Sequence, residues 1–315
     1  MEYSVAIRTL GTAGEKYQLL LDSLYAQTIR PKGIYVYIAE GYSLPKETIG
    51  IEQYVYVKKG MLNQRAQKYD EIDTEYILFL DDDLYLPTDT VEIMFSLLSR
   101  EGAHVISPDI LPNHNKGYKG TLQMLLSGRM RPRCNDDYWG YKVMRNSGYS
   151  YNQNPINDVY VSQTNAGACF LCKKDDFLKI HLEEELWLDE VAYPIGEDQV
   201  MYYKMYKKGL KLLTWYNHKV RHLDAGMNMH KDKQLKLIFS DFRFKIIFWH
   251  RFIFKPEKYF LINTLNVISI TYSLGFSLII SILKFQFDVL KIKIAGIKSA
   301  WKFLDSDTYM NLPKV

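Results

Sequence analysis

Cysteine is scarce in this sequence: the 315 residues include only Cys134, Cys169 and Cys172. An odd number this small cannot build a disulfide framework, and it favours a reducing compartment. Internal repeats and low-complexity tracts are also missing, which excludes repeat proteins and disordered chains. The first ten residues lack the basic and apolar blocks of a signal peptide and instead predict a strand that contains Arg8. We therefore expect an ordinary globular protein of the cytoplasm.

The glycine-rich loops that bind dinucleotides or nucleoside triphosphates are missing too. Residues 11–14 (Gly-Thr-Ala-Gly) lack the third glycine of a dinucleotide motif, and residues 10–16 are a poor version of a lysine-containing phosphate loop. Cys169 and Cys172 have the spacing of a redox pair, but they fall within an apolar strand and would point to opposite faces. Redox and zinc chemistry are therefore not expected.

Strands and helices alternate in the first 110 residues. Short apolar or β-rich runs predict strands, and apolar residues at helical spacing predict helices between them. The expected strands are 5–10, 33–39, 54–57, 76–80 and 104–107, and the expected helices are 19–25, 63–69 and 88–100. Unbroken apolar strands that alternate with helices indicate an α/β fold with a mostly parallel sheet covered on both faces. Ligands of such sheets bind beyond the carboxyl ends of the strands.

Residues 111–160 are rich in Asn, Gly, Tyr and Arg, and we interpret them as an excursion over the sheet edge that helps to select a bound partner. Asn146-Ser147-Gly148 predicts a hairpin turn between two Tyr-containing segments. Apolar strand character returns at 161–173 and 210–215. Helices are expected at 175–180 and 199–208, the second ended by Gly209.

Charge divides the chain in two. Residues 1–230 carry 26 Lys+Arg against 30 Asp+Glu, whereas residues 231–315 carry 14 against 6. The second part holds a basic amphipathic stretch at 235–254, 25 uncharged residues at 259–283 and another basic, apolar stretch at 284–303. As a helix, 25 residues could cross a hydrocarbon core of about 30 Å. We therefore predict two parts, a globular domain and a helical tail.

The tail is predicted to bind the anionic inner face of a membrane, as a peripheral or monotopic anchor. Nucleic acid is not expected as a partner, because the basic residues of the tail alternate with bulky apolar ones that need burial. Both flanks of the uncharged stretch are basic, which opposes a single span. Helices lying in the interface, or a hairpin that bends near Gly275, are favoured. The alternative is a helical subdomain packed against the rest of the chain or a second copy.

The strongest chemical signal is the run Asp81-Asp82-Asp83 directly after the apolar strand 76–80. Three adjacent carboxylates repel one another unless a cation or hydrogen-bond donor neutralises them. Their hard oxygens suit Mg²⁺ or Mn²⁺, which typically bridge carboxylates to substrate phosphates. A solvated acidic turn is the alternative, and the position at a strand end favours the metal.

Two later signals complete the candidate site. Glu197 and Asp198 head the helix 199–208, where they could cap the helix or act as a general base. His222 follows the last strand, close in sequence to His218, and a neutral imidazole could complete a metal site begun by a carboxylate.

The order of these pieces resembles the family 2 glycosyltransferases, which have the GT-A fold and include enzymes of bacterial cell-surface polysaccharide synthesis. The likeness covers about residues 3–230. The matching segments are residues 4–10, 20–31, 60–66, 76–87 and 164–174, together with Glu197-Asp198 and His222. Residues 81–83 correspond to the DxD motif of the family. In the segment 60–66 the Arg comes before the Ala, unlike the family pattern. Two positions depart from the family: Glu40 stands where an acidic D-D-G-S is usual, and Arg8 stands where many members have Pro.

The resemblance implies an inverting, metal-dependent transfer from a nucleotide-diphosphate sugar to a hydroxyl of a glycan or lipid-linked acceptor. The implied ligands of Mn²⁺ or Mg²⁺ are Asp83, Asp81 and His222, and the implied general base is Asp198, with Glu197 as the second candidate. The implied donor-binding residues are Thr9, Glu40, Asn63, Arg65, Asp81 and Asp82. Two alternatives stay open: a nucleotidyl-transferring enzyme on a similar sheet, and a non-catalytic binding protein with a GT-A-like fold.

Overall fold

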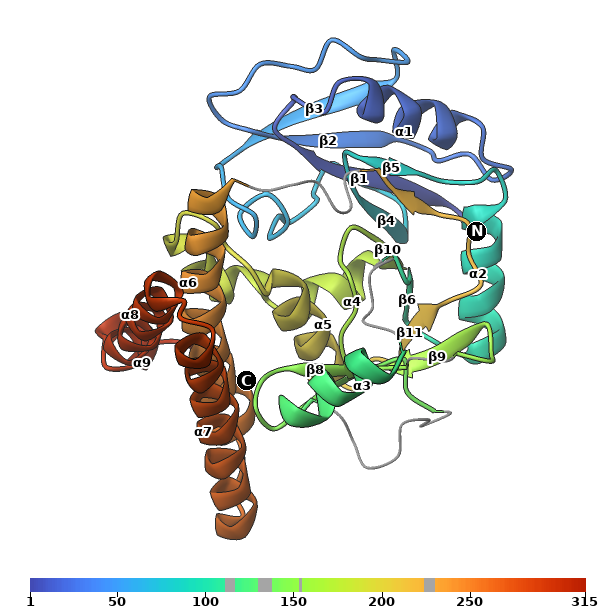
Figure 1. Cartoon of the computed structure of the whole chain (residues 1–315). Coiled ribbons are helices and arrows are strands. Elements are labelled where there is room, and N and C mark those ends of the chain that lie inside the picture. The colour runs from blue at the N-terminus through green and yellow to red at the C-terminus, as the bar shows by residue number, and fades with distance from the viewer. Residues whose placement is uncertain (111–116, 130–137, 153–154, 224–229) are drawn as a thin grey trace.

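The structure is a computed structural model, and it describes residues 1–110, 117–129, 138–152, 155–223 and 230–315. Cys134 and several residues of the 111–160 excursion lie outside the described residues. An eight-stranded sheet forms the centre, with the strand order β3-β2-β1-β4-β10-β6-β11-β9 (Figure 1). Its strands are β1 Tyr3–Thr9, β2 Ile34–Ala39, β3 Glu52–Val57, β4 Tyr76–Asp81, β6 Val105–Pro108, β9 Val159–Ser162, β10 Cys169–Lys173 and β11 Leu212–Trp215.

The sheet is mixed. Strands β1 to β4 run parallel to one another, and β6 runs parallel to β11, whereas β10 is antiparallel to both β4 and β6. Strand β9 is antiparallel to β11 at the edge. The predicted α/β class is thereby confirmed, and the carboxyl ends of β1, β2 and β4 meet at one edge.

Helices cover both faces, and alternating strand residues enter two different cores. Val5 and Ile7 of β1 pack with α1 (Glu15–Tyr25) and α2 (Thr90–Glu101), whereas Ala6 faces the core that contains α5 (Glu197–Lys207). The same alternation puts Cys169 and Cys172 in opposite cores, as expected for strand residues three apart. Both thiols are buried and free, so the redox spacing has no structural counterpart.

The helix expected at 63–69 does not form. Residues 61–66 make turns instead, because Asp189 accepts hydrogen bonds from the backbone amides of Leu62 and Asn63. Tyr69, with φ +56°, then takes a left-handed conformation that a helix cannot continue. The predicted strand 161–173 is likewise divided into β9 and β10, with an irregular loop between them.

The hairpin expected around Asn146–Gly148 is present, as the antiparallel strands β7 (Tyr141–Val143) and β8 (Tyr149–Tyr151). A short helix, α3 (Gly117–Leu126), precedes it, and residues 182–190 form a 3₁₀ segment, η1. A second small sheet pairs β5 (Leu84–Tyr85) with β12 (Arg221–His222). The remaining element of this part of the chain is α4 (Lys174–Leu178).

The tail is helical, as predicted: α6 (Lys231–Phe248), a π-helical turn η2 (Trp249–Phe254), α7 (Phe260–Leu283), α8 (Phe287–Leu304) and α9 (Asp307–Met310). Helix α6 packs into the core beside α5, and α8 packs along α6 (Figure 1). Arg251 of η2 forms an ion pair with the fully buried Glu185 at 2.8 Å. The tail is therefore fixed to the rest of the chain through buried charges and aromatic side chains.

Helix α7 runs through Gly275 without a bend, so the hairpin expected there is wrong. Gly275 keeps a helical backbone and does not take the left-handed conformation of a turn, and the chain reverses instead near Phe285, which has φ +54°. Among the described residues, α7 is the one helix long and apolar enough to cross a membrane, and only 17% of its apolar window is buried. It extends beyond the rest of the molecule in Figure 1.

Candidate active site

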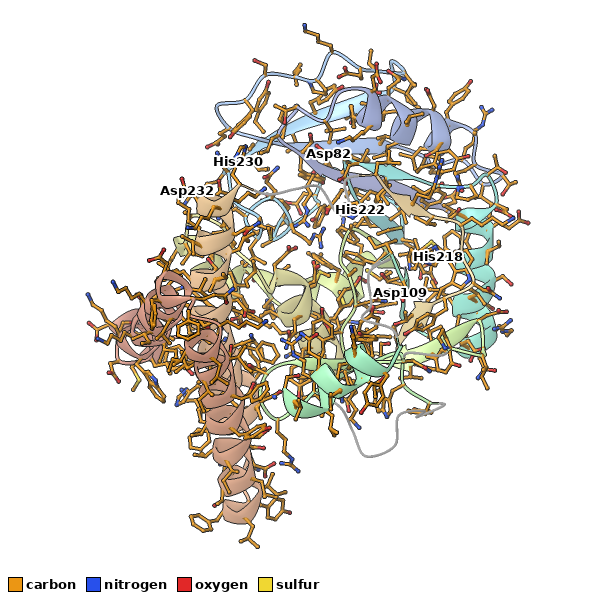
Figure 2. All side chains as sticks on the ribbon, in the orientation of Figure 1. Asp82, Asp109, His218, His222, His230 and Asp232 are labelled. Carbon is orange, nitrogen blue, oxygen red and sulfur yellow. The ribbon has the colours of Figure 1, made fainter. Side chains whose placement is uncertain are left out.

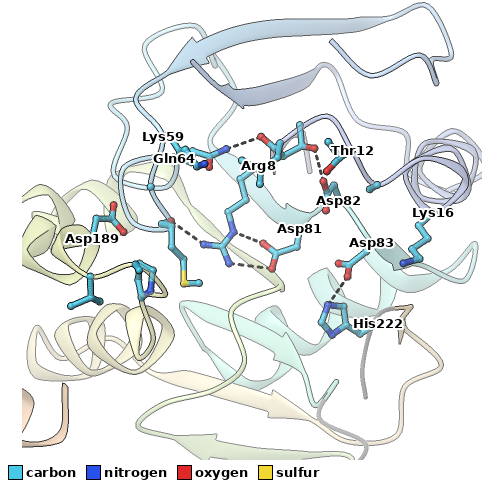
Figure 3. Close-up of a pocket in the computed structure, with 18 residues that line it drawn as sticks. Arg8, Thr12, Lys16, Lys59, Gln64, Asp81, Asp82, Asp83, Asp189 and His222 are labelled. Atoms are coloured by element: carbon cyan, nitrogen blue, oxygen red, sulfur yellow. Dashed lines mark hydrogen bonds and ion pairs between the residues drawn. The ribbon is translucent and has the colours of Figure 1, made fainter. Parts of the chain in front are cut away.

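A cavity of about 670 Å³ opens at the carboxyl ends of β1 and β4, where the α/β pattern predicts a ligand (Figure 3). Strand ends, the turn at 59–64, the 189–194 loop and β12 all contribute to it. Its lining residues are Arg8, Thr9, Leu10, Thr12, Ala13, Lys16, Lys59, Gly60, Met61, Gln64, Asp81, Asp82, Asp83, Asp189, Val191, Ala192, Pro194 and His222.

Asp81 ends β4 and faces two arginines. Arg8 Nε and Nη2 donate to its carboxylate at 2.5 and 3.1 Å, and Arg65 Nη2 reaches Oδ1 at 3.1 Å. Burial alone would raise the pKa of Asp81, but the positive charges of Arg8 and Arg65 lower it below its ordinary value. The carboxylate is therefore ionised and already neutralised by protein cations.

Asp82 lies on the other side of the strand end and pairs with β1. Thr9 Oγ1 and Asp82 Oδ2 are 2.5 Å apart. Burial, followed by the charges of Asp81 and Asp83, raises the pKa of Asp82 to about 6. Thr9 and Asp82 thus form part of the polar lining of the cavity.

Asp83 and His222 are brought together by the small β5–β12 sheet. His222 is the register partner of Leu84, and the amide of Leu223 donates to the carbonyl of Asp83 at 2.8 Å. The result is a 3.1 Å approach of His222 Nε2 to Asp83 Oδ2 at the cavity wall (Figure 3). His218 lies apart from this pair, because its Nε2 donates to the carbonyl of Asp109 (Figure 2).

The donor atoms of Asp83 and His222 fit a divalent cation. No group of three or more potential ligands occurs among the described residues. Mg²⁺ and Mn²⁺ sites that work on phosphates commonly use one or two protein ligands together with substrate oxygens and water. Of the three predicted metal ligands, Asp83 and His222 lie together at the cavity wall. The carboxylate of Asp81 instead forms ion pairs with Arg8 and Arg65.

Glu197 and Asp198 occupy different environments at the start of α5. Glu197 is 1% exposed and accepts ion pairs from Arg8 Nη1 at 2.8 Å and Arg65 Nη1 at 3.0 Å. Asp198 is 39% exposed, its Oδ1 is enclosed without a hydrogen bond, and Arg65 lies 3.5 Å away. Burial of this oxygen, followed by the charge of Glu197, raises the pKa of Asp198 to about 6. Asp198 is thus the more exposed carboxylate of the pair, and Glu197 is a buried ion-pair partner of the two arginines.

A loop of small residues after β9 shapes this region. A Cβ at Gly167 would lie 2.1 Å from Asp198 Oδ1 and 2.6 Å from Arg65 Nη1, so only glycine admits both side chains. Gly196 has φ +83°, and a Cβ there would meet the Phe244 ring of α6 at 2.3 Å. The glycine before the acidic pair therefore allows the tail to pack directly against the start of α5.

Five predicted residues lie outside the cavity lining: Glu197, Asp198, Arg65, Asn63 and Glu40. Arg65 is buried behind Asp81 and holds the carboxylates of the site. Asn63 donates through Nδ2 to Asp189 at 2.7 Å and fixes the turn beneath the cavity. Glu40 is exposed on the turn after β2 and is absent from the lining.

Sequence reasoning missed the roles of Arg8, Lys16, Lys59 and Asp189, all of which line the cavity. Arg8 carried a signal, since a charged residue inside an apolar strand is unusual and it replaces a common Pro of the resembled family. The two lysines and Asp189 had none: Lys16 lies in the first turn of α1, Lys59 in the turn after β3 and Asp189 near the end of η1, and none of these positions stands out in the sequence.

Three comparisons with known proteins bear on this arrangement. Residues 7–106, less than half of the chain, match the glycosyl transferase family 64 domain. A search of curated proteins found no match. A crystal structure of GalNAc-T7 with UDP, GalNAc and Mn²⁺ is similar, with a TM-score of 0.52 and 12% sequence identity over 85% of this chain. This chain spans 55% of that protein's chain.

The comparisons confirm the predicted GT-A fold and support the predicted enzyme class, a glycosyltransferase. The match to the family 64 domain includes the end of β1, the turn with Arg65 and the run Asp81–Asp83. The narrower assignment to family 2 and to a bacterial type is not confirmed by either similarity.

Proposed function

We propose that this protein transfers a sugar, with inversion, from a nucleotide-diphosphate sugar to a hydroxyl of a glycan or lipid-linked acceptor. The proposal depends mainly on one observation: Asp83 and His222 meet 3.1 Å apart in a cavity at the carboxyl ends of the strands. The similar GalNAc-T7 structure contains UDP and Mn²⁺, which supports a nucleotide donor and a divalent cation here.

In the proposed reaction, Asp83 and His222 would hold the cation, and Lys16 and Lys59 add positive charge to the cavity wall. When bound, Mn²⁺ or Mg²⁺ would supply Lewis-acid stabilisation of the diphosphate leaving group. Asp198 accepts the proton of the acceptor hydroxyl as oxygen attacks the anomeric carbon, and its raised pKa makes the carboxylate a stronger base. One base on one face of the sugar corresponds to a single displacement, and hence to inversion.

Metal-dependent hydrolysis of a panel of nucleotide sugars tests this proposal. We expect release of the nucleoside diphosphate from one donor with Mn²⁺ or Mg²⁺, and loss of that release with a chelator. NMR of the anomeric proton before mutarotation should show the inverted sugar. Transfer of a nucleotidyl group would favour the nucleotidyl-transferase alternative, and donor binding without turnover would favour the binding-protein alternative.

We further propose that the tail associates with the cytoplasmic face of a membrane. Support comes from α7, whose apolar side chains are largely exposed, with Phe260 at 82% and Leu261 at 76%. The excess of Lys and Arg in residues 231–315 favours an anionic leaflet. Extraction of the full chain from membranes by detergent but not by high salt is the expected result. Release by salt alone would leave α7 without a role in the bilayer.

A further inference from the structure

A second cavity, of about 620 Å³, lies between the tail and the loop that follows η1. Its lining residues are Glu190, Val191, Ala192, Tyr193, Asp232, Leu235, Lys236, Phe239, Ser240, Arg243, Ile292 and Ser299. Val191 and Ala192 also line the cavity that contains Asp83 and His222. The two cavities therefore lie on either side of the same short segment of chain.

The lining surface of the second cavity is mainly apolar, although Asp232, Ser240 and Ser299 also contribute to its helical walls. Leu235 and Phe239 of α6 face it together with Ile292 of α8. A helical subdomain that only supported the fold would fill such a space with these side chains. An open apolar volume within the usual size range of ligand sites is instead suited to a hydrocarbon chain.

Two cationic side chains line this cavity, and only one of them already has a counter-ion. Arg243 Nη2 is 2.7 Å from Glu190 Oε2, so this guanidinium already has a counter-ion. Lys236 is exposed, and its one recorded contact is with the face of the Tyr193 ring, 5.7 Å from the centroid. Asp232, four residues earlier on α6, also lines the cavity, but among the described residues no carboxylate forms an ion pair with the Lys236 ammonium. Since Tyr193 directly follows Ala192, this cation lies near the segment shared with the donor cavity.

We propose that the cavity between α6 and α8 binds a lipid phosphate that carries the acceptor sugar. The hydrocarbon would lie along Leu235, Phe239 and Ile292, with the phosphate at Lys236 and the sugar directed past Val191 and Ala192 toward the donor. This inference rests on the proposed function and names the acceptor class for that site. A free glycan is a poorer fit, because sugar hydroxyls would be left without partners against the apolar walls.

A photoreactive decyl phosphate tests the site on the full chain in vesicles of zwitterionic lipid. We expect crosslinks in peptides of Lys231–Phe248 and Phe287–Leu304, reduced by unlabelled decyl phosphate but much less by inorganic phosphate or decyl maltoside. Crosslinking confined to Phe260–Leu283 would overturn the proposal, as would equal competition by inorganic phosphate or by the uncharged detergent.

A pair of matched variants tests the location. Ser299→Trp places a large side chain in the cavity, and Ala295→Trp places the same side chain on an exposed position of the same helix. We expect Ser299→Trp to reduce crosslinking at least about fivefold and Ala295→Trp to leave it unchanged, because filling the cavity removes the space for the chain. Equal crosslinking in the two variants would overturn the proposal.

Charge reversal gives a second, milder test in case Ser299→Trp does not fold. Lys236→Glu should reduce crosslinking by decyl phosphate, whereas Lys298→Glu, on an exposed position of α8 outside the lining, should not. Binding of UDP with Mn²⁺, measured in parallel, separates the two proposals. If the wild-type protein does not bind UDP, the proposed donor site is contradicted and the acceptor site is not. If it binds UDP but shows no specific lipid crosslinks, the proposed acceptor site is contradicted and the donor site is not.

Discussion

The ionisation of Asp198 should set the acid limb of the pH–rate profile. Its pKa is raised to about 6, and it must be unprotonated to accept the acceptor proton. Transfer at saturating donor should therefore rise with pH and level off above about 7. At pH 5 roughly one tenth of the carboxylates would be ionised, so turnover should be about tenfold below the plateau.

Two variants should move this limb in opposite directions. Glu197→Gln removes the negative charge that raises the pKa of Asp198, so the acid limb should move to lower pH. Arg8→Met removes a positive charge that lowers it, so the limb should move to higher pH. A merely structural role for either residue would change the plateau without moving the midpoint.

The assay is initial transfer rate from pH 4.5 to 8.5 at fixed metal and saturating donor, with a parallel profile of Asp198→Asn. We expect that variant to lose turnover by about 10² or more at every pH, with donor binding nearly intact. A midpoint that stays fixed in both Glu197→Gln and Arg8→Met would refute the assignment of Asp198 as base, and near-wild-type turnover in Asp198→Asn would do so directly.

Three further outcomes are expected. Asp83→Asn should weaken binding of Mn²⁺ in the presence of UDP at least about tenfold by calorimetry, because one of two protein ligands is lost. Gly167→Ala should reduce turnover about 10²-fold, since its Cβ would displace Asp198, whereas Gly275→Ala, which meets no atom within 4 Å, should not. Glu185→Gln should lower the free energy of unfolding by about 3 kcal/mol in denaturant titrations, because buried cations lose their counter-ion. Unchanged metal affinity in Asp83→Asn, unchanged turnover in Gly167→Ala or unchanged unfolding free energy in Glu185→Gln would contradict the role given to that residue.

Most of the sheet could be predicted because its strands are buried on both faces and appear as apolar runs. Tyr76–Leu80 is such a run, and it marks β4 and the acidic residues after it. The rule that ligands bind at the carboxyl ends of parallel strands then placed Asp83 correctly at the cavity.

The pairing of Asp83 with His222 was implied only by the resemblance, because residue patterns do not reveal the short elements that produce it. Strands β5 and β12 have two residues each, yet their pairing alone brings His222 to Asp83. The turn that carries Arg65 looked helical, since its apolar spacing is compatible with a helix. The competing hydrogen bonds come from Asp189, more than a hundred residues away. Such tertiary partners override local propensity.

The contacts of α6 bear on how membrane association and catalysis are connected. Phe244 fills the space over Gly196, directly before the Glu197–Asp198 pair, and Arg243 forms an ion pair with Glu190 in the second cavity. A tail joined by a flexible linker could bind a bilayer without affecting the base. Here a shift of α6 would move the start of α5, because packed side chains transmit such displacements. Membrane docking through α7 and correct placement of Asp198 are therefore expected to depend on the same packed interface.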